Sequence, residues 1–252
     1  MRIALIGYGK MGQMIASVAR ERGHDVVCII DPLTSADTID SPAFRSADVA
    51  IEFSRPDAAP SNVRAAVAQG VPVVSGTTGW DVEALREELG NHQSAVSGHP
   101  GVIWSSNYSI GVNILFAVNK YLARLLQNAG GYSPSITEVH HIHKLDAPSG
   151  TAKTLAEDIE RLSLLHSPLR GEPEGCPLSE RVAGGVHIDS IREGEVPGIH
   201  EVRWESDADI LSLRHEAKSR KGFALGAVLA AEWLQGKTGW HQLDEAFALT
   251  AE

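Results

Sequence analysis

Residues 138–153, EVHHIHKLDAPSGTAK, gather three histidines and a lysine within five consecutive positions. Histidine exchanges a proton near neutral pH, and lysine carries a compact positive charge. The whole chain has a formal net charge of −10, so it needs a local positive region if it is to attract an anion. This combination indicates general acid catalysis on a small molecule that carries carboxylates.

The residues after the histidines predict the start of a helix over 149–162, with Ser149 or Asp146 as its N-cap. The amides of Gly150 and Thr151 would lie in the first helical turn, where N–H groups lack intrahelical partners and attract anions. Thr151 adds a hydroxyl group. We therefore expect an anion pocket next to the proton donor.

The segment 135–144 alternates in polarity and predicts a strand. In a strand, His140 and Lys144 point to one side and His141 and His143 to the other, although this alternation weakens at a strand end. Plainer interpretations stay open: a structural histidine, a solvated histidine-rich loop, or a metal site built on the HxH pair. No third ligand at suitable spacing is visible in the sequence, so we expect no metal.

The motif GYGKMG follows a short apolar run and opens a helical pattern, so Gly7, Gly9 and Gly12 form a GxGxxG turn. The first glycine allows the tight bend, the second lets the backbone approach a pyrophosphate, and the third packs helix against strand. Asp31 ends the next apolar run, where an acid binds the adenosine ribose hydroxyls. We expect a dinucleotide site, and a glycine turn in an unrelated α/β protein is the alternative.

Asp31 is followed by Pro32 and Leu33 rather than by arginine or lysine. A 2′-phosphate would face a carboxylate with no neighbouring cation, so we predict that NADH is preferred, with NADPH as the second candidate. The stretch SGTTGW, residues 75–80, suits a cofactor site at the carboxyl edge of a sheet, although a simple turn fits it equally well.

Two kinds of organisation follow each other along the chain. Apolar runs at 2–7, 24–32, 47–54, 71–79 and 101–107 alternate with helical patterns, which predicts a doubly wound parallel sheet. After Asn107 we expect a long helix over 110–130, the strand and helix described above, and a meander of three half-polar strands at 186–194, 198–206 and 209–217. A mobile loop is expected at 166–185, and the apolar helix at 219–236 is expected to pack back on the first domain.

Composition excludes several classes of function. The isoelectric point of about 5.5 argues against a nucleic-acid partner. No run of eighteen apolar residues is present and the N-terminus does not resemble a signal peptide, so we expect no membrane partner. Cys28 and Cys176 lack any CxxC neighbour, which favours a reducing, cytoplasmic location.

The motifs together resemble one family. They are similar to those of the dihydrodipicolinate reductases, also called 4-hydroxy-tetrahydrodipicolinate reductases, of bacterial lysine and diaminopimelate synthesis: EVHHIHKLDAPSGTA, GYGKMG, SGTTG, SSNYSIGVN, IREGEVPGIHEV and HEAKSRKGFALGAVLAAEWL. The resemblance covers nearly the whole chain. It implies an α/β fold with a Rossmann-type domain, residues 1–109 and 220–252, and an α+β substrate domain with an open mixed sheet, residues 110–219.

The resemblance also implies residue roles. His140 would be the catalytic proton donor and Lys144 its cationic partner, while substrate contacts would come from His141, His143, Gly150 and Thr151. Cofactor contacts would come from Gly7, Tyr8, Gly9, Lys10, Met11, Gly12, Asp31, Gly76, Thr77, Thr78, Ser106, Asn107, Tyr108 and Ser109.

The implied reaction is the NAD(P)H-dependent reduction of 4-hydroxy-tetrahydrodipicolinate, a small dicarboxylate, with loss of water. Family members are homotetramers joined through the sheets of the second domain, which would explain the half-polar strands. The chain is shorter than better-known members between Asp31 and Ala47 and lacks the basic residue that many place after the acid. Two alternatives stay open: another Rossmann-type NAD-dependent dehydrogenase of amino-acid metabolism, and a non-catalytic NAD-sensing protein.

Overall fold

The computed structural model describes residues 1–91, 99–164 and 185–248. The chain forms two compact units, the first from Met1–Ile110 with Arg220–Thr250 and the second from Gly111–Ser219. The predicted loop at 166–185 and Cys176 lie outside the described residues, except for Gly185. Among the described residues, no helix has the length and apolar character needed to cross a membrane.

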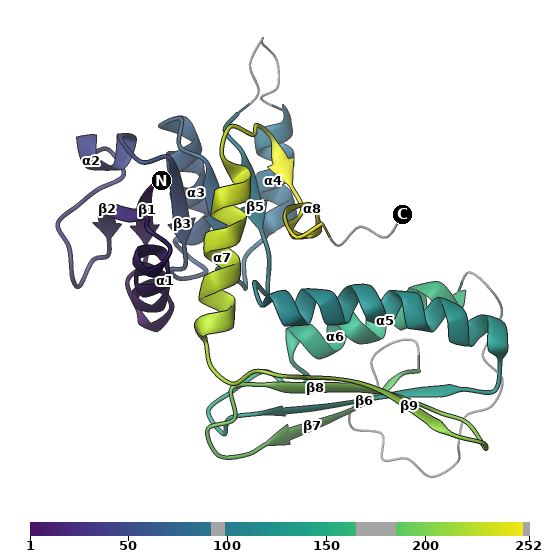
Figure 1. Cartoon of the computed structure of the whole chain (residues 1–252). Helices are drawn as coiled ribbons and strands as arrows, with labels where there is room; N and C mark the ends of the chain where they lie inside the picture. Colours follow the sequence, from purple (N-terminus) through teal and green to yellow (C-terminus); the bar gives the residue numbers. More distant parts are fainter. Residues whose placement is uncertain (92–98, 165–184, 249–252) are drawn as a thin grey trace. The chain divides into compact units, whose positions relative to one another are not determined.

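The first unit is built on a six-stranded parallel sheet with the order β10-β5-β4-β3-β1-β2 (Figure 1). The strands are β1 (Arg2–Ile6), β2 (Asp25–Ile30), β3 (Val49–Glu52), β4 (Val73–Ser75), β5 (Val102–Trp104) and β10 (Trp240–His241). The helices of this unit are α1 (Lys10–Glu21), α2 (Pro42–Arg45), α3 (Ala59–Ala68), α4 (Val82–Asn91), α7 (Lys221–Leu234) and α8 (Leu243–Ala246). Because the strand order reverses at β1, the predicted doubly wound sheet is confirmed.

Helices cover both faces of this sheet, which is why its strands read as continuous apolar runs. On one face, Ile3 and Leu5 pack with residues of α1 and α7. On the other face, Ala4 and Ile6 pack with residues of α2, α3 and α4. The C-terminal helix α7 therefore joins the core of the first unit, as its apolar composition predicts.

Helix α7 also approaches the loop that follows β5 very closely. A Cβ atom built on Gly226 would lie 1.7 Å from the carbonyl oxygen of Tyr108. Only a glycine allows this approach, so α7 holds the loop that carries Ser106 to Ser109 against the end of the sheet.

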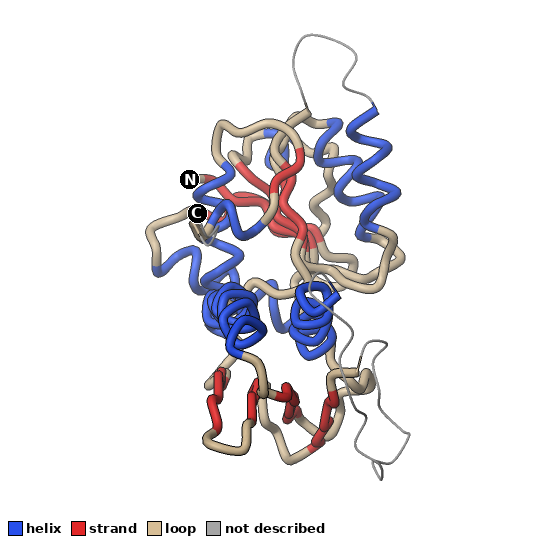
Figure 2. Tube along the Cα trace, turned by 90° about the vertical axis from the view of Figure 1, so that its right-hand side faces the viewer, coloured by secondary structure: helices blue, strands red, loops and turns tan. Residues whose placement is uncertain are grey.

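The second unit has a four-stranded mixed sheet with the order β7-β6-β8-β9. Its elements are α5 (Ile110–Ala129), β6 (Ser133–His140), α6 (Gly150–Leu164), β7 (His187–Arg192), β8 (Ile199–Glu205) and β9 (Ile210–Glu216). Helices α5 and α6 lie on one face of the sheet (Figure 2). Their side chains pack with Ile136, Ile188 and Val202. The predicted open mixed sheet is confirmed.

Several sequence-based expectations for individual elements are wrong. The expected strand 135–144 ends at His140, so the residues after it no longer alternate between sheet faces. The three later strands do not form a meander, because β6 lies between β7 and β8 and pairs with both. The short elements α2, β10 and α8 were not predicted, since they are too short to show a hydrophobic period.

Candidate functional site

In the glycine turn between β1 and α1, close backbone contacts exclude a side chain at two of the three glycines. Gly7 has a φ of +91°, and a Cβ atom there would lie 2.1 Å from the carbonyl oxygen of Phe53. A Cβ atom on Gly12 would lie 2.2 Å from the carbonyl oxygen of Gly7. At Gly9, which precedes α1, a Cβ atom would meet nothing within 4 Å. The open space at Gly9 therefore fits a ligand that approaches the backbone and the helix N-terminus, as a pyrophosphate does.

Asp31, at the end of β2, holds this turn in place. Its carboxylate accepts hydrogen bonds from the amide of Tyr8 at 2.9 Å and from the amide of Leu33 at 2.9 Å. These bonds, that of Tyr8 first, lower the pKa of Asp31, so the group is a carboxylate at neutral pH. The negative charge thus lies where the sequence predicts it, beside the glycine turn.

A buried acid that sequence reasoning missed organises the neighbouring loops. Glu52, at the end of β3, is fully buried. Its carboxylate accepts hydrogen bonds from the hydroxyl of Thr77 at 2.8 Å, from that of Ser75 at 2.6 Å, and from the amide and hydroxyl of Ser54. A Cβ atom on Gly76 would lie 2.1 Å from the Phe53 ring. Glu52 therefore sets the shape of the Gly76–Thr78 turn, and Thr78 itself is exposed.

The last predicted cofactor segment runs from Ser106 to Ser109, and the buried side chain of Tyr108 anchors it to the protein interior. This side chain is 2% exposed and donates a hydrogen bond to the carbonyl of Ser75 at 2.8 Å. Burial, followed by the charge of Glu52, raises its pKa well above the usual value. The Tyr108 side chain thus has a structural contact inside the protein, whereas Ser106 is exposed.

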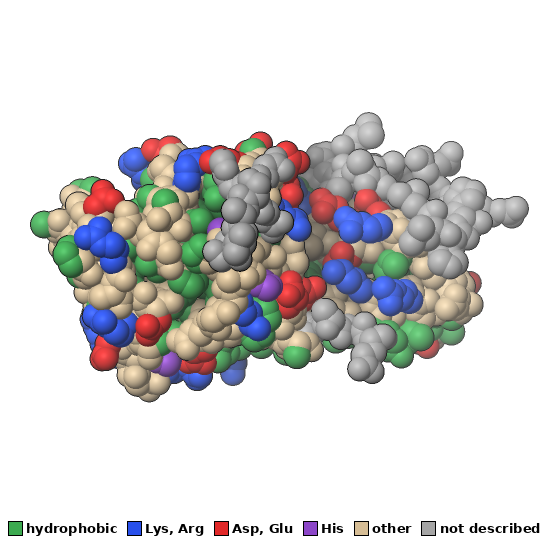
Figure 3. Space-filling view, turned by 90° about the horizontal axis from the view of Figure 1, so that it is seen from above, with side chains coloured by type: hydrophobic (Ala, Val, Ile, Leu, Met, Phe, Trp, Pro, Cys, Tyr) green, Lys and Arg blue, Asp and Glu red, His purple; other side chains and the backbone are tan. Residues whose placement is uncertain are grey.

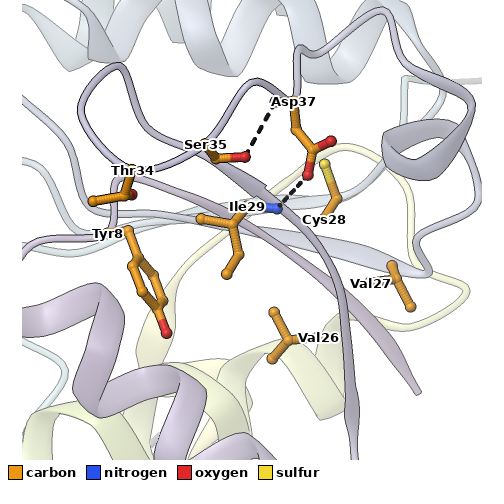
Figure 4. A pocket seen from close by; sticks show the side chains of 8 residues that line it. All are labelled: Tyr8, Val26, Val27, Cys28, Ile29, Thr34, Ser35 and Asp37. Atoms are coloured by element: carbon orange, nitrogen blue, oxygen red, sulfur yellow. Dashed lines mark hydrogen bonds between the residues drawn. The ribbon is translucent and has the colours of Figure 1, made fainter.

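A pocket of about 300 Å³ lies beside β2 and includes Tyr8 of the glycine turn (Figure 4). Its other lining residues are Val26, Val27, Cys28, Ile29, Thr34, Ser35 and Asp37. Figure 4 shows the Asp37 carboxylate next to the backbone of β2, where it accepts a hydrogen bond from the Ile29 amide at 3.2 Å. The loop after Asp31 thereby satisfies part of an otherwise unpaired sheet edge.

Strand register assembles the second group of candidate residues. Along β6, Glu138 and His140 are two residues apart and face the helices, as their burial shows. Antiparallel pairing places His200 of β8 opposite Glu138. Parallel pairing places Arg192 of β7 beside His140. Three strands therefore bring one acid, two histidines and one arginine together, and only His140 was predicted.

Glu138 is the centre of this group and has no solvent exposure. Its Oε2 atom lies 2.6 Å from Nδ1 of His140, at ion-pair distance. Its Oε1 atom accepts hydrogen bonds from the Arg192 guanidinium at 3.0 Å and from the Ser149 amide at 3.1 Å. Burial alone would raise the pKa of Glu138, but these contacts outweigh it and lower the pKa well below its usual range.

His200 lies next to His140 and is uncharged. The two rings meet edge to face with centroids 5.0 Å apart, and Nε2 of His200 lies 3.2 Å from the Ser149 hydroxyl. Burial, followed by the nearby His140, lowers the pKa of His200 to about 3, so its ring is uncharged at neutral pH. Sequence reasoning missed this histidine because it lies 60 residues after His140 in the sequence.

The segment after β6 holds the other predicted residues. Lys144 is mostly buried, and its ammonium group lies 2.7 and 2.9 Å from the two carboxylate oxygens of Asp146. Its charge also contributes to the lowered pKa of His200, so it belongs to the same electrostatic environment. The rings of His141 and His143 lie 6.1 Å apart, and His143 is exposed.

Helix α6 begins at Gly150, and Ser149 rather than Asp146 is its N-cap. The Ser149 hydroxyl accepts a hydrogen bond from the Ala152 amide at 3.2 Å. Ser149 thus touches Glu138 through its amide and His200 through its hydroxyl. The amides of Gly150 and Thr151 follow in the first turn, so the start of the helix is tied directly to the histidine pair.

The trio Glu138, His140 and His200 brings three ligand atoms within 4.8 Å of one another, which is compatible with a metal ion. The HxH pair of the sequence, His141 and His143, does not belong to this trio, whose third member comes from β8. However, the Arg192 guanidinium lies at hydrogen-bond distance from Glu138. A second positive charge at this position is unfavourable, so the arrangement fits a charged hydrogen-bond network better than a metal centre.

Acidic and basic side chains are interspersed on the face of the molecule shown in Figure 3, and no continuous basic area is visible there. This distribution agrees with the net charge of −10 and lacks the footprint of a nucleic-acid surface on that face.

Comparison with known proteins gives a consistent result. A family model described as "Dihydrodipicolinate reductase, N-terminus" matches residues 1–108, and one described as "Dihydrodipicolinate reductase, C-terminus" matches residues 111–247. A 4-hydroxy-tetrahydrodipicolinate reductase of Christiangramia forsetii is 44% identical over 244 residues, which are 95% of this chain and 94% of that protein. One of Akkermansia muciniphila is 36% identical over 247 residues, 96% of this chain and 95% of that protein.

Solved structures include one with the same two-unit fold. A dihydrodipicolinate reductase from Paenisporosarcina sp. TG-14, solved with dipicolinate bound, superposes with a TM-score of 0.75. The alignment covers 96% of this chain and 97% of that one, at 22% identity. At this level of identity the match supports the fold.

The space at Gly9 gives a testable prediction for the cofactor site. Gly9→Ala should change the free energy of unfolding by less than about 0.5 kcal/mol, because its Cβ meets no protein atom. The same methyl group would occupy the phosphate position, so the Kd for NADH should rise at least about tenfold in calorimetry.

Gly12→Ala is the matched contrast. Its Cβ meets the backbone of Gly7, so the folded state should lose about 1–3 kcal/mol or more in denaturant titration. An unchanged NADH affinity in the Gly9 variant would contradict the assignment of this turn to the cofactor.

Proposed function

The chain belongs to the dihydrodipicolinate reductase family, and we propose that the Glu138, His140 and Ser149 region is where it binds and protonates its substrate. The resemblance inferred from the motifs is thereby confirmed. The protein is an NAD(P)H-dependent oxidoreductase that reduces 4-hydroxy-tetrahydrodipicolinate in lysine and diaminopimelate biosynthesis. The roles of individual residues are our proposal.

The reaction needs a hydride, a proton and the loss of water. Water leaves the hydroxylated ring to give a conjugated imine, and the nicotinamide, when bound, supplies the hydride that reduces it. Addition of a hydride leaves an electron pair on the adjoining carbon and nitrogen atoms, which one proton quenches. His140 delivers this proton, because it is a histidine held in a defined position at the edge of the site.

The observation that carries this assignment is the ion-pair contact of 2.6 Å between Glu138 and His140. The buried carboxylate of Glu138 places a negative charge beside one ring nitrogen of His140. It also fixes the ring orientation, as a general acid requires. The neutral His200 next to it does not compete as a second charged donor.

The substrate carboxylates are held by groups that the same region places nearby. The amides of Gly150 and Thr151 belong to the first turn of α6, where the helix N-terminus favours negative charge. Lys144 supplies a positive charge that the structure pairs with Asp146. A substrate carboxylate that binds Lys144 would replace the Asp146 contact. His141 and His143 complete the basic region.

We further propose that NADH is preferred to NADPH. The support comes from Asp31, whose carboxylate is fixed by two backbone amides and stays ionised at neutral pH. A 2′-phosphate at the ribose would meet this charge. Pro32 and Leu33 follow Asp31, and Leu33, which is 92% exposed, has no charge with which to compensate the phosphate.

The homotetramer remains a proposal, as does the cytoplasmic location. The homotetramer is supported by the face of the four-stranded sheet that points away from α5 and α6. There Val139 pairs with Ile191 on one side and Ile199 on the other, which forms an apolar row flanked by ion pairs such as Arg214–Glu216. A mixed surface of this kind suits a subunit interface. A single-chain mass in light scattering would contradict the proposal.

The catalytic assignment predicts the effect of two substitutions. The purified chain should consume NADH when the product of dihydrodipicolinate synthase is supplied. His140→Ala and Lys144→Ala should each lower kcat by about 10²- to 10⁴-fold, because they remove the proton source and a stabilising charge. His241→Ala, on β10, is the control and should keep its activity. Near-normal turnover in both site variants would overturn the assignment.

The cofactor preference predicts a gain of function at Leu33. Leu33→Arg would place a guanidinium beside Asp31 without loss of packing, because the leucine is exposed. The kcat/KM ratio of NADPH to NADH should rise about tenfold, since arginine binds a phosphate with charge-assisted bonds. Leu33→Gln controls for the loss of the apolar side chain. Equal kcat/KM values for the two cofactors in the unaltered protein would refute the preference itself.

A further inference from the structure

We propose that Glu138 is the positioning residue of the active site: it holds Nδ1 of His140 so that Nε2 delivers the proton, and it fixes the substrate-binding start of α6 with the same carboxylate. This inference rests on the proposed role of His140 as the proton donor. It adds a residue that the motifs did not single out, and it states which ring nitrogen takes part in the reaction.

The contact between Glu138 and His140 places Nδ1, rather than Nε2, against the acid. Oε2 of Glu138 lies 2.6 Å from Nδ1, and neither residue has more than 8% exposure. A carboxylate oxygen has no proton to donate, so a bare Nδ1 at this distance would set two lone pairs against each other. The contact therefore favours a hydrogen on Nδ1, which leaves Nε2 as the ring nitrogen that transfers the proton to the substrate.

Gly198, just before β8, lies close to Nε2 of His140, where a side chain would not fit. A Cβ atom on Gly198 would lie 3.1 Å from Nε2 of His140 and 3.3 Å from its Cδ2. The backbone at this glycine has a φ of +155°, which other residues rarely adopt. Without a side chain at this position, the Gly198 backbone can lie close to Nε2, whereas Nδ1 faces Glu138.

The second oxygen of Glu138 ties the proton donor to the anion pocket. Oε1 accepts from the amide of Ser149, the residue that caps α6. Arg192 donates to the same oxygen and also to the carbonyl of Asp146 at 2.7 Å. The carboxylate of Glu138 thus holds two parts of the site. Oε2 contacts the ring that protonates the substrate, and Oε1 contacts the turn that leads to Gly150 and Thr151. A shift of Glu138 would disturb proton transfer and carboxylate binding together.

The first experiment examines the unaltered protein by NMR with ¹⁵N-labelled histidine, and His140 is assigned from the spectrum of His140→Gln. We expect the neutral ring of His140 to carry its proton on Nδ1, with Nε2 as the titrating nitrogen. A neutral ring with its proton on Nε2 and a bare Nδ1 would overturn the proposal. This readout does not depend on catalytic activity, and the His140→Gln variant serves only for the assignment.

The second experiment compares Glu138→Gln with Glu157→Gln, an exposed acid on α6. Glu138→Gln should lower kcat about 10- to 1,000-fold, within the usual contribution of a general acid. Calorimetry should show pyridine-2,6-dicarboxylate binding weakened about tenfold, with the NADH affinity unchanged within about twofold. Glu157→Gln should change none of these values.

The outcomes separate the possible failures. If Glu138→Gln keeps its kcat and its dicarboxylate affinity, Glu138 is not a positioning residue. If NADH and dicarboxylate binding weaken equally, the acid has only a general structural role, and the proposal fails. If the unaltered protein does not turn over the substrate, the proposed function fails, while the NMR measurement still tests the bond to Nδ1.

Discussion

The second unit depends on the burial of one negative charge. Glu138 is fully removed from solvent, and a carboxylate in that position is costly unless charged and polar partners surround it. The partners come from three separate segments: Arg192 from β7, His140 from β6 itself, and Ser149 from the start of α6. A one-residue slip of β6 would turn the acid to the opposite face and break its contacts with all three partners. The charge therefore specifies register as well as chemistry.

The first unit also contains a buried acid, but this acid has a different role. Glu52 is also fully buried at the carboxyl end of a strand, but its partners are hydroxyls and an amide rather than cations. It binds the turns that follow β3 and β4 into one rigid group next to the glycine turn. In each unit a buried acid holds the neighbouring loops, and it does so through direct hydrogen bonds to their side chains and amides. Substitutions of either acid would act through these loops.

The histidine pair shows how tertiary packing assigns different roles to identical side chains. His140 faces a carboxylate, whereas His200 faces a hydroxyl and the ring of His140. Burial without an acid partner keeps His200 neutral, and this limits the positive charge next to Arg192 and Lys144. This region of the second unit therefore gathers the positive charges of Arg192 and Lys144, although the chain as a whole is acidic.

The sequence alone determined the α/β order of the first unit, the glycine turn and the acid at Asp31, because these depend on local period and spacing. It also pointed to His140 and to the helix start after it, since the residue types are adjacent in the chain. It could have pointed to Glu138, which stands two positions before His140 and so shares its face of the strand. It could not determine that β6 lies between β7 and β8, nor where β6 ends. Those features follow from pairing between distant segments, and only that pairing brings Arg192 and His200 to the acid.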